Sequence, residues 1–165
     1  MYPEILYVMA EDLLEACRDQ DIKLALAESC TGGLIAGCIT SVAGSSAVFE
    51  RGFVTYTNQS KAEMLGVPAH VFIEHGSVSE ACARAMAEGA LSHSKAKLAL
   101  SVTGIAGPGG ATTDKPVGLV HLACAREGFE TCHERHVFKG DRERVRIQAV
   151  ESSLKLLLNC CAVAN

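Results

Sequence analysis

The sequence predicts an α/β protein, a three-layer α/β/α sandwich built on a mixed, mostly parallel sheet. Three observations predict this fold class. Strand patterns alternate with helical patterns over the first two thirds of the chain, two adjacent strand patterns follow, and a long helical pattern comes last. Alternation favours parallel strands with helices on both faces, whereas adjacent strands favour an antiparallel hairpin. Because the chain has no repeat, linker or break in composition, we expect a single domain over residues 1–165.

The first quarter of the chain predicts a helix, a strand and a second helix. Residues 4–18 place apolar side chains at helical spacing with acidic residues between them, which indicates an amphipathic helix. Residues 23–27 form a short apolar run typical of a buried strand. The polar turn at residues 28–33 follows this strand, and a helix rich in small residues begins at Leu34.

The middle of the chain predicts a second strand and two further helices. Residues 53–57 are rich in β-branched and aromatic residues, which favour a strand. Residues 59–65 predict a helix that a glycine and a proline end. Ser77 or Ser79 is expected to cap the next helix, which ends near His93.

The last third predicts three strands and a final helix. Residues 98–102 are a continuous apolar strand, and the glycine-rich loop at residues 103–110 follows it. Residues 118–125 and 130–138 are two further strand patterns separated by a short turn, so we expect a hairpin. Asp141 is expected to cap the last long helix.

Composition argues against several classes of protein. The 48% hydrophobic content excludes intrinsic disorder. The 15 Lys and Arg residues against 19 Asp and Glu residues give a net charge of −4, and there is no basic tract, so we expect no nucleic-acid partner. No run of about 18 apolar residues predicts a membrane span.

The cysteines predict free thiols rather than a disulfide framework. No two have C-x-x-C spacing, and most lie in apolar runs where a thiol packs as a small hydrophobe. The N-terminus lacks the basic and apolar regions of a signal peptide. We therefore expect a reduced, cytoplasmic protein. The eight are Cys17, Cys30, Cys38, Cys82, Cys124, Cys132, Cys160 and Cys161.

Three polar or glycine-rich turns follow predicted strands and are expected to form the site. They are residues 28–33, 56–61 and 103–110. Ligands in open α/β sheets bind beyond the carboxyl ends of strands. If the three strands are parallel, the three turns meet at one edge of the sheet.

The first turn places Ser29 directly after a strand and before the opening of a helix. Ser29 is therefore a candidate nucleophile, and backbone N–H groups of the turn are candidates to hold an oxyanion or a phosphate. The G-x-S-x-G nucleophile elbow is absent, and Ser29 could simply cap the helix.

The second turn contributes Tyr56 and Lys61. A serine hydroxyl needs a base to take its proton, and burial can lower the pKa of a lysine enough for it to serve. A tyrosine hydroxyl beside the pair can relay the proton or orient it. The alternatives are a solvated surface lysine and a strand tyrosine whose hydroxyl lies at the surface.

The glycine-rich loop and the start of the last helix are candidates to bind substrate. Backbone N–H groups of the glycine loop can bind a phosphate. The loop matches no standard phosphate-binding motif, however, and the alternative is a rigid connection between core elements. The arginines at the start of the last helix, Arg142, Arg144 and Arg146, could clamp a phosphate, or they could lie on a solvated helix face. The histidines are scattered and show no metal-ligand spacing, so we expect no metal.

These motifs together resemble the CinA C-terminal-domain family. The resemblance runs from about residue 5 to residue 160. It rests on residues 27–33 (AESCTGG), 56–61 (YTNxxK), 76–79 (GSVS), 103–110 (TGIAGPGG), 115–118 (KPVG) and 140–142 (GDR). Active members are nicotinamide-nucleotide amidases, which hydrolyse the carboxamide of nicotinamide mononucleotide to nicotinate mononucleotide and ammonia in pyridine-nucleotide salvage. Because the amino-terminal domain of two-domain members is absent, the chain resembles the stand-alone amidase form.

The resemblance implies a role for each matching residue. Ser29 matches the proposed nucleophile, Lys61 the general base and Tyr56 the assisting hydroxyl. Thr103 and the loop after it match the segment that lines the substrate, and Arg142 matches a basic residue near the phosphate. The full set of residues expected to bind substrate is Cys30, Thr31, Gly32, Gly33, Thr103, Gly104, Gly107, Gly109 and Arg142.

The sequence therefore predicts a serine amidase that needs no cofactor, acts on a small nucleotide and forms a homo-oligomer, as is usual in the family. Three alternatives remain open. One is a non-catalytic module that binds a nucleotide or a protein partner. Another is a cysteine hydrolase that uses Cys30, and the third is a regulator of DNA uptake, as the family name suggests, although the acidic charge argues against direct DNA contact.

Overall fold

The computed structural model describes residues 1–163, so the last two residues of the predicted domain lie outside the described residues. Within this range, five strands form one sheet in the order β2-β1-β3-β4-β5. The strands are β1 (Leu24–Glu28), β2 (Phe49–Val54), β3 (Leu98–Gly104), β4 (Leu119–Arg126) and β5 (Cys132–Val137). The helices are α1 (Glu4–Asp19), α2 (Leu34–Thr40), α3 (Asn58–Leu65), α4 (Ala69–His75), α5 (Glu80–Ser92) and α6 (Arg142–Ala162), with a 3₁₀ turn, η1, at Ser45–Ala47.

The sheet is mixed, as the sequence predicted. β1 pairs in parallel with β2 on one side and with β3 on the other. β4 runs antiparallel to β3, and β5 runs antiparallel to β4, so β5 points in the same direction as the first three strands. The carboxyl ends of β1, β2 and β3 therefore lie at the same edge of the sheet.

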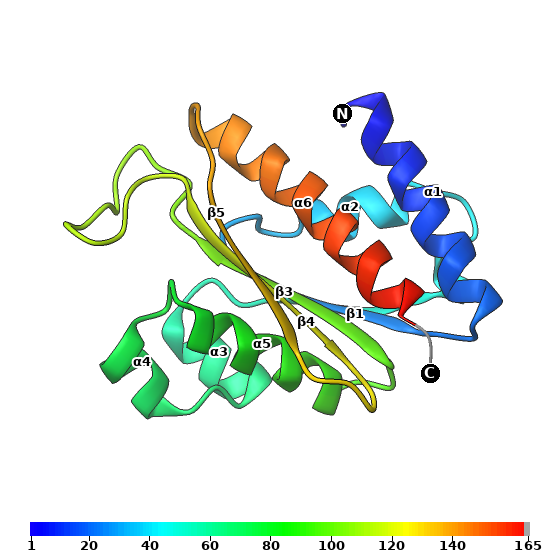
Figure 1. Cartoon of the computed structure of the whole chain (residues 1–165), viewed down its shortest axis with the longest axis horizontal. Helices are drawn as coiled ribbons and strands as arrows, with labels where there is room; N and C mark the ends of the chain where they lie inside the picture. The colour runs from blue at the N-terminus through cyan, green and yellow to red at the C-terminus, as the bar shows by residue number, and fades with distance from the viewer. Residues whose placement is uncertain (164–165) are drawn as a thin grey trace.

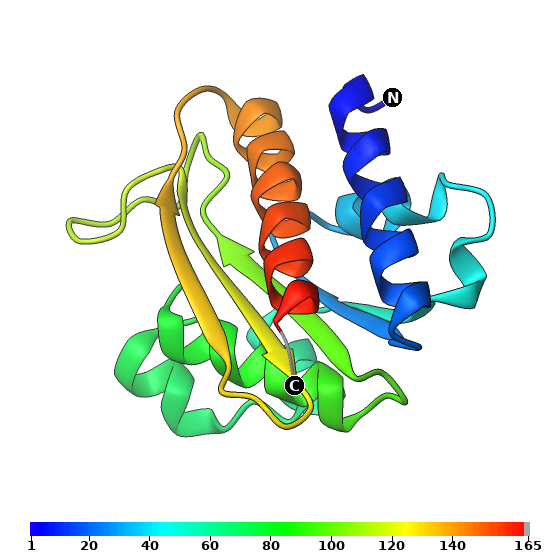
Figure 2. The ribbon, with the colours of Figure 1, turned by 45° about the vertical axis from the view of Figure 1, so that its right-hand side comes forward.

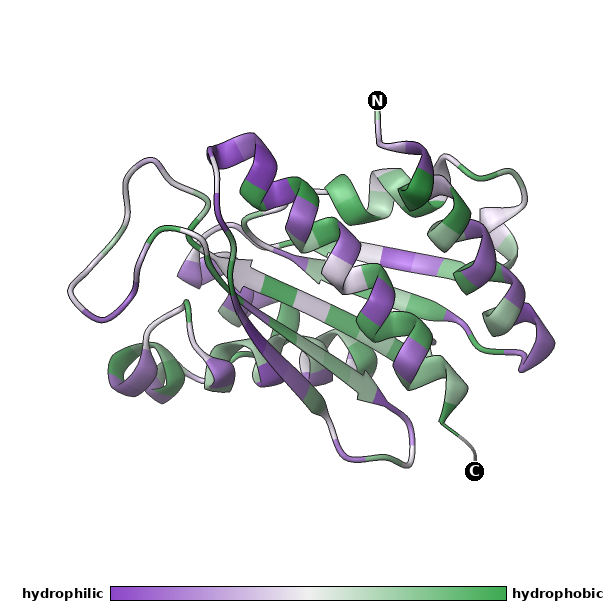
Figure 3. Cartoon of the chain, turned by 45° about the horizontal axis from the view of Figure 1, so that its top comes forward, coloured by the Kyte–Doolittle hydropathy of each residue, from purple (hydrophilic) through white to green (hydrophobic). Residues whose placement is uncertain are grey.

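Helices cover both faces of the sheet, which confirms the three-layer prediction. α1, α2 and α6 lie on one face, and α3, α4 and α5 lie on the other (Figure 1, Figure 2). Alternation along β1 separates the two cores, because Leu24 and Leu26 pack with the first group of helices, whereas Ala25 and Ala27 pack with the second. Apolar residues dominate the central strands β1, β3 and β4 and the inner sides of the helices, whereas the edge strand β5 and the outer helix surfaces are largely hydrophilic (Figure 3). No helix in residues 1–163 combines the length and apolar character needed to cross a bilayer.

The second strand lies earlier than the sequence predicted. The prediction placed it at residues 53–57, but β2 ends at Val54. The reason is the start of α3, because the Thr57 side chain accepts a hydrogen bond from the Ser60 N–H at 3.1 Å and closes a capping box. The chain must leave the sheet so that Thr57 can make this cap.

The short helix α4 was absent from the prediction, and two other helix starts were predicted correctly. α4 has only seven residues and begins after a proline that gives no side-chain cap, so it carries little sequence signal. Ser79 caps α5 by accepting from the Cys82 N–H at 3.1 Å. Asp141 caps α6 by accepting from the Arg144 N–H at 2.9 Å.

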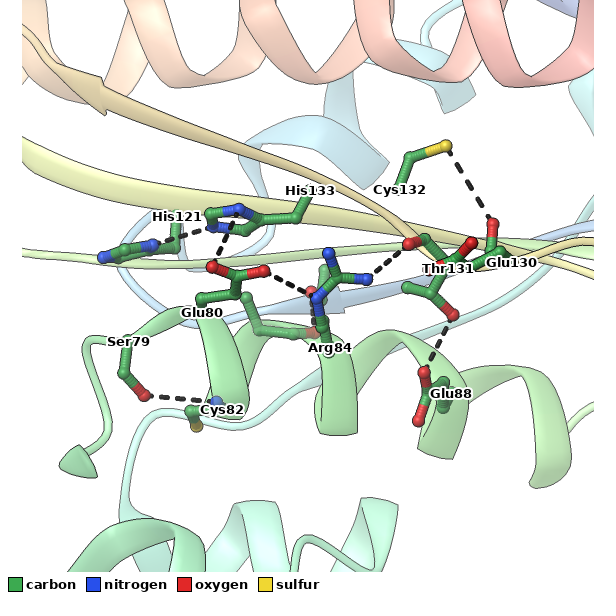
Figure 4. Close-up of polar contacts among 12 residues, drawn as sticks. Ser79, Glu80, Cys82, Arg84, Glu88, His121, Glu130, Thr131, Cys132 and His133 are labelled. Atoms are coloured by element: carbon green, nitrogen blue, oxygen red, sulfur yellow. Dashed lines mark hydrogen bonds and ion pairs between the residues drawn. The ribbon is translucent and has the colours of Figure 1, made fainter. Parts of the chain in front are cut away.

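A polar network joins α5 to the β4–β5 hairpin (Figure 4). Nδ1 of His121 lies 2.9 Å from Nε2 of His133, and the two rings stack with centroids 5.2 Å apart. Nδ1 of His133 lies 3.6 Å from one carboxylate oxygen of Glu80. The other carboxylate oxygen of Glu80 accepts a hydrogen bond from Arg84 Nε at 2.8 Å. This network fixes the start of α5 against the sheet.

Both histidines of this network favour the neutral form. Burial lowers the pKa of His121 to about 4, and the nearby positive groups of His133, Arg135 and Lys115 act in the same direction. Burial also lowers the pKa of His133, although the Glu80 carboxylate opposes this shift. The folded protein therefore resists proton uptake in a range where free imidazoles titrate.

This resistance predicts that acid weakens the fold. An imidazole in the unfolded chain takes up a proton near pH 6.5, so the free energy of unfolding should be fully retained above about pH 7 and should fall as the pH drops toward 4. The variant His121→Gln removes one titrating ring and keeps a hydrogen-bonding partner for His133. Between pH 7 and pH 5 it should lose roughly 1–2 kcal/mol less stability than the parent in urea titrations.

The matched control is His70→Gln, which changes an exposed histidine of α4. It should lose as much stability as the parent over the same pH range. Equal losses in the parent and in His121→Gln would contradict the prediction.

Candidate functional site

A cavity of about 220 Å³ lies at the edge of the sheet where β1, β2 and β3 end. It receives residues from all three turns that follow these strands, from the segment before α5 and from the first turn of α6. The lining residues are Ser29, Cys30, Tyr56, Lys61, Ser77, Val78, Thr103, Gly104, Ile105, Ala106, Gly107, Gly109, Gly110 and Arg142.

Ser29 and Lys61 are in direct contact at the base of this cavity. Nζ of Lys61 lies 3.0 Å from Oγ of Ser29. Both side chains are buried, with 1% of Lys61 and 8% of Ser29 exposed. β1 delivers Ser29, whose N–H donates to the Val102 carbonyl of β3, and α3 delivers Lys61 from the opposite side.

The surroundings of Lys61 favour an uncharged amine. Burial lowers the pKa of this group below the ordinary value of a lysine. Among residues 1–163, no carboxylate forms an ion pair with it. Its other close partner is the Thr55 carbonyl oxygen, 2.8 Å from Nζ. A neutral amine can donate to this carbonyl and still offer its lone pair to the Ser29 hydroxyl.

The buried carboxylate of Glu28 holds the turn that carries Ser29. It accepts hydrogen bonds from the Thr31 hydroxyl at 2.6 Å and from the backbone N–H groups of Gly33, Ile35 and Ala36 at 3.0, 3.1 and 2.8 Å. The positive end of α2 compensates its charge. The sequence analysis did not single out Glu28, although an acid directly before a polar turn and a helix start is a usable signal.

Arg146 of α6 holds the same turn from its other side. Its Nε donates to the Cys30 carbonyl at 3.1 Å, and its Nη2 donates to the Thr31 carbonyl at 2.9 Å. Together, Glu28 satisfies three N–H groups where the turn passes into α2, and Arg146 satisfies two carbonyls of the turn. The Ser29 turn is therefore fixed by a carboxylate and a guanidinium that do not line the cavity.

Three residues predicted to bind substrate lie outside the cavity lining. Thr31, Gly32 and Gly33 build the turn. The N–H of Gly33 is bound to Glu28, so it is not free to receive an anion. Within residues 1–163, neither the Cys30 N–H nor the Thr31 N–H donates to a backbone carbonyl.

Cys30 lines the cavity beside Ser29, but its thiol is poorly suited to act as a nucleophile. Burial raises its pKa to about 12, whereas the reactive form of a cysteine is the thiolate. This environment argues against the cysteine-hydrolase alternative.

Tyr56 and Arg142 lie together at the mouth of the cavity. Nη2 of Arg142 donates to the Tyr56 hydroxyl at 2.9 Å, and Nη1 donates to the Gly107 carbonyl at 2.8 Å. Tyr56 is 57% exposed. The Tyr56 hydroxyl therefore contacts Arg142, whereas its backbone carbonyl is the group near Lys61, at 3.5 Å from Nζ.

The glycine loop lines one wall of the cavity, and packing accounts for two of its glycines. A Cβ at Gly104 would lie 2.8 Å from the Leu119 carbonyl oxygen, too close for any other residue. At Gly107 the backbone φ is +83°, and a Cβ would lie 2.5 Å from the Val117 side chain. Gly109 has open space around it. The loop is thus a tight connection as well as a cavity wall.

Ser77 and Val78 also line the cavity, although the sequence analysis did not place them in the site. The Thr103 hydroxyl donates to the Ser77 carbonyl at 2.8 Å and ties this segment to the end of β3. Their signal was the Gly-Ser-Val-Ser motif, which entered the prediction as a helix cap and as part of the family resemblance but not as part of the site. Within residues 1–163, no group of three or more histidine, cysteine or acidic residues has the geometry to hold a metal ion.

Comparison with known proteins identifies relatives that span this whole fold. The sequence matches the family described as CinA C-terminal domain over residues 6–161. A CinA-like protein of Citrifermentans bemidjiense is 55% identical over 148 residues, which cover 85% of this chain but 35% of that protein. The chain thus spans about a third of that relative. The nicotinamide-nucleotide amidohydrolase PncC of Escherichia coli K12 is 46% identical over 149 residues, which cover 90% of each chain.

Solved structures agree with these sequence relationships. The competence/damage inducible protein CihA from Agrobacterium tumefaciens superposes with a TM-score of 0.94 at 44% identity, covering 96% of this chain and 98% of that one. The competence damage-inducible protein A (ComA) from Klebsiella pneumoniae superposes with a TM-score of 0.93 at 33% identity, covering 97% and 99%. The chain therefore belongs to the CinA C-terminal domain family, as its motifs predicted.

Proposed function

We propose that this protein hydrolyses the carboxamide of nicotinamide mononucleotide to nicotinate mononucleotide and ammonia, with Ser29 as nucleophile and Lys61 as general base. The observation that carries the proposal is the buried contact of 3.0 Å between Lys61 Nζ and Ser29 Oγ. The relationship to the nicotinamide-nucleotide amidohydrolase PncC supports the choice of substrate.

The chemistry follows from the uncharged state of Lys61. The neutral amine takes the proton of the Ser29 hydroxyl while the oxygen attacks the amide carbon. The resulting ammonium passes this proton to the departing nitrogen, which leaves as ammonia. Water then hydrolyses the acyl-Ser29 ester with the same amine as base. The N–H groups of Cys30 and Thr31 are our candidates to stabilise the oxyanion.

The size and shape of the cavity indicate how a nucleotide would enter. Its volume of about 220 Å³ is below the range of roughly 300–1,000 Å³ typical of sites that enclose a whole ligand. We infer that the pyridine ring and its amide enter the cavity, while the ribose phosphate stays at the exposed mouth. Arg142 lies there, and we propose that it contacts the phosphate.

We assign Tyr56 to orienting Arg142, because its hydroxyl contacts that guanidinium. This assignment differs from the expected relay of protons beside Ser29. A role in pyridine-nucleotide salvage, a cytoplasmic location and a homo-oligomeric state are further parts of the proposal, and they rest on the family relationship.

Removing the nucleophile should abolish hydrolysis without unfolding the protein. We expect Ser29→Ala to release ammonia from nicotinamide mononucleotide at least about 1,000-fold more slowly than the parent. Its circular dichroism spectrum and thermal midpoint should change little. Ser46→Ala, which alters an exposed serine of η1, should keep the parental rate. Turnover by Ser29→Ala at the parental rate would exclude the mechanism, and a parent that binds the nucleotide without releasing ammonia would indicate a binding module.

The activity should depend on pH through Lys61. Only the neutral amine accepts a proton, so kcat/KM should be low at acidic pH and should rise as the pH passes the Lys61 pKa. Because burial lowers this pKa, the rise should be complete below the ordinary lysine value of about 10.4.

The matched variants are Lys61→Met, which keeps much of the side-chain length, and Lys95→Met, which changes an exposed lysine. Lys61→Met should lower kcat about 100-fold or more and remove the rising limb, whereas Lys95→Met should leave both unchanged. An unaltered pH profile in Lys61→Met would refute the assignment of the base.

The carboxylate of Glu28 should matter for turnover although it does not line the cavity. Glu28→Gln replaces an acceptor oxygen by an amide N–H group that faces backbone donors. We expect a stability loss of about 1–3 kcal/mol and a fall in kcat of about tenfold or more, with a smaller change in KM. Urea unfolding and steady-state ammonia assays measure the two effects. A variant with full kcat would show that the turn positions Ser29 without Glu28.

A further inference from the structure

Three cysteines from three elements meet at the end of the molecule remote from Ser29. Cys124 of β4 and Cys132 of β5 are direct cross-strand partners. Cys160 lies in the last turns of α6, and all three residues line a second cavity of about 220 Å³. Arg142 and Cys160 are 18 residues apart in α6, which corresponds to about 27 Å along the helix. This cavity is therefore separate from the candidate active site.

The three thiols differ in exposure and in acidity. Cys132 is exposed at the sheet edge, whereas 1% of Cys124 and 6% of Cys160 are exposed. Hydrogen bonds from the Cys124 and Cys132 thiols lower the pKa of Cys160 to about 7. A hydrogen bond with Cys160, together with burial, raises the pKa of Cys124 well above its usual value. Cys160 is thus the member of the group with substantial thiolate at neutral pH.

The hairpin places Cys132 on the wall of the cavity that Cys160 also lines. The Cys132 side chain points toward the α6 side of the sheet, whereas the adjacent His133 points toward α5 (Figure 4). β5 is an edge strand, so Cys132 has solvent on one side and the cavity on the other. Arg126 holds the end of α6 in place by donating to the Cys160 carbonyl at 2.8 Å and to the Val163 carbonyl at 2.7 Å.

We propose that Cys160 and Cys132 are a peroxide-reactive thiol pair that closes a disulfide between α6 and β5. The Cys160 thiolate attacks one oxygen of hydrogen peroxide, the O–O bond breaks, and the leaving hydroxide takes a proton to become water. The product is a sulfenic acid on Cys160. The Cys132 sulfur then attacks the Cys160 sulfur and displaces a second water. In total, two thiols and one peroxide give one disulfide and two waters.

A second pair of cysteines provides an internal control. Cys17 Sγ and Cys161 Sγ are only 3.8 Å apart, but both residues are fully buried. Burial raises the pKa of Cys17 to about 12, so neither access nor thiolate favours oxidation. Proximity alone would select Cys17 and Cys161, whereas the exposure of Cys132 and the lowered pKa of Cys160 select Cys132 and Cys160.

The test treats the reduced full-length chain with a small excess of hydrogen peroxide at pH 7. We expect the count of thiols titrated after denaturation to fall from eight to six and to return to eight with dithiothreitol. A non-reducing digest should contain one peptide that links Cys132 to Cys160. Loss of the two thiols should be at least about tenfold faster in the folded chain than in urea.

Two variants separate the steps of the reaction. Cys132→Ser should form no disulfide and should accumulate a sulfenic acid on Cys160 that dimedone traps. Cys160→Ser should lose the fast reaction, and Cys17→Ser should keep it. Eight thiols after peroxide treatment, a linkage that includes Cys17, Cys124 or Cys161, or a disulfide only between separate chains through Cys132 would each overturn the proposal. These readouts do not use ammonia release, so they are independent of the proposed amidase activity.

Discussion

The contact between the Lys61 amine and the Ser29 hydroxyl is the interaction on which the account of this protein depends. Lys61 is 1% exposed and has no acidic partner in residues 1–163, so only three oxygen contacts, from Ser29, Thr55 and Tyr56, could stabilise a positive charge on it. Burial of this kind is costly for stability unless the group is neutral. A neutral amine beside a hydroxyl is a base beside a weak acid, and such a pair can activate serine without histidine or a metal.

The fold supplies this contact from opposite directions. Ser29 follows β1 at the carboxyl edge of the sheet. The chain leaves β2 and begins α3 at the Thr57 capping box, and Lys61 of α3 then contacts Ser29. Glu28 and Arg146 then fix the short turn after Ser29. The hydroxyl is therefore held by main-chain and buried side-chain contacts, as a nucleophile that must meet its base at a fixed distance requires.

Much of this arrangement could be predicted from sequence, because it follows local patterns. Alternating Leu and Ala in β1 and β3 identify buried strands, and the polar turns after them mark the edge where a site forms. The end of β2 and the whole of α4 could not be predicted, since a capping box and a seven-residue helix carry weaker signals than an aromatic, β-branched run. The contacts of Arg146 and Tyr56 join residues far apart in the sequence, and only the folded chain shows that the Tyr56 hydroxyl lies against Arg142.

The most direct test of the central claim is the titration of the Lys61 amine itself. NMR of the chain labelled with ¹⁵N and ¹³C in lysine can follow the side-chain signals with pH, and the signal missing in Lys61→Met identifies the residue. The account predicts that Lys61 loses its proton well below the pH at which the exposed lysines do, and that this pKa shifts when Ser29 is replaced by alanine. A Lys61 signal that titrates together with the exposed lysines, near pH 10.4, would contradict the account.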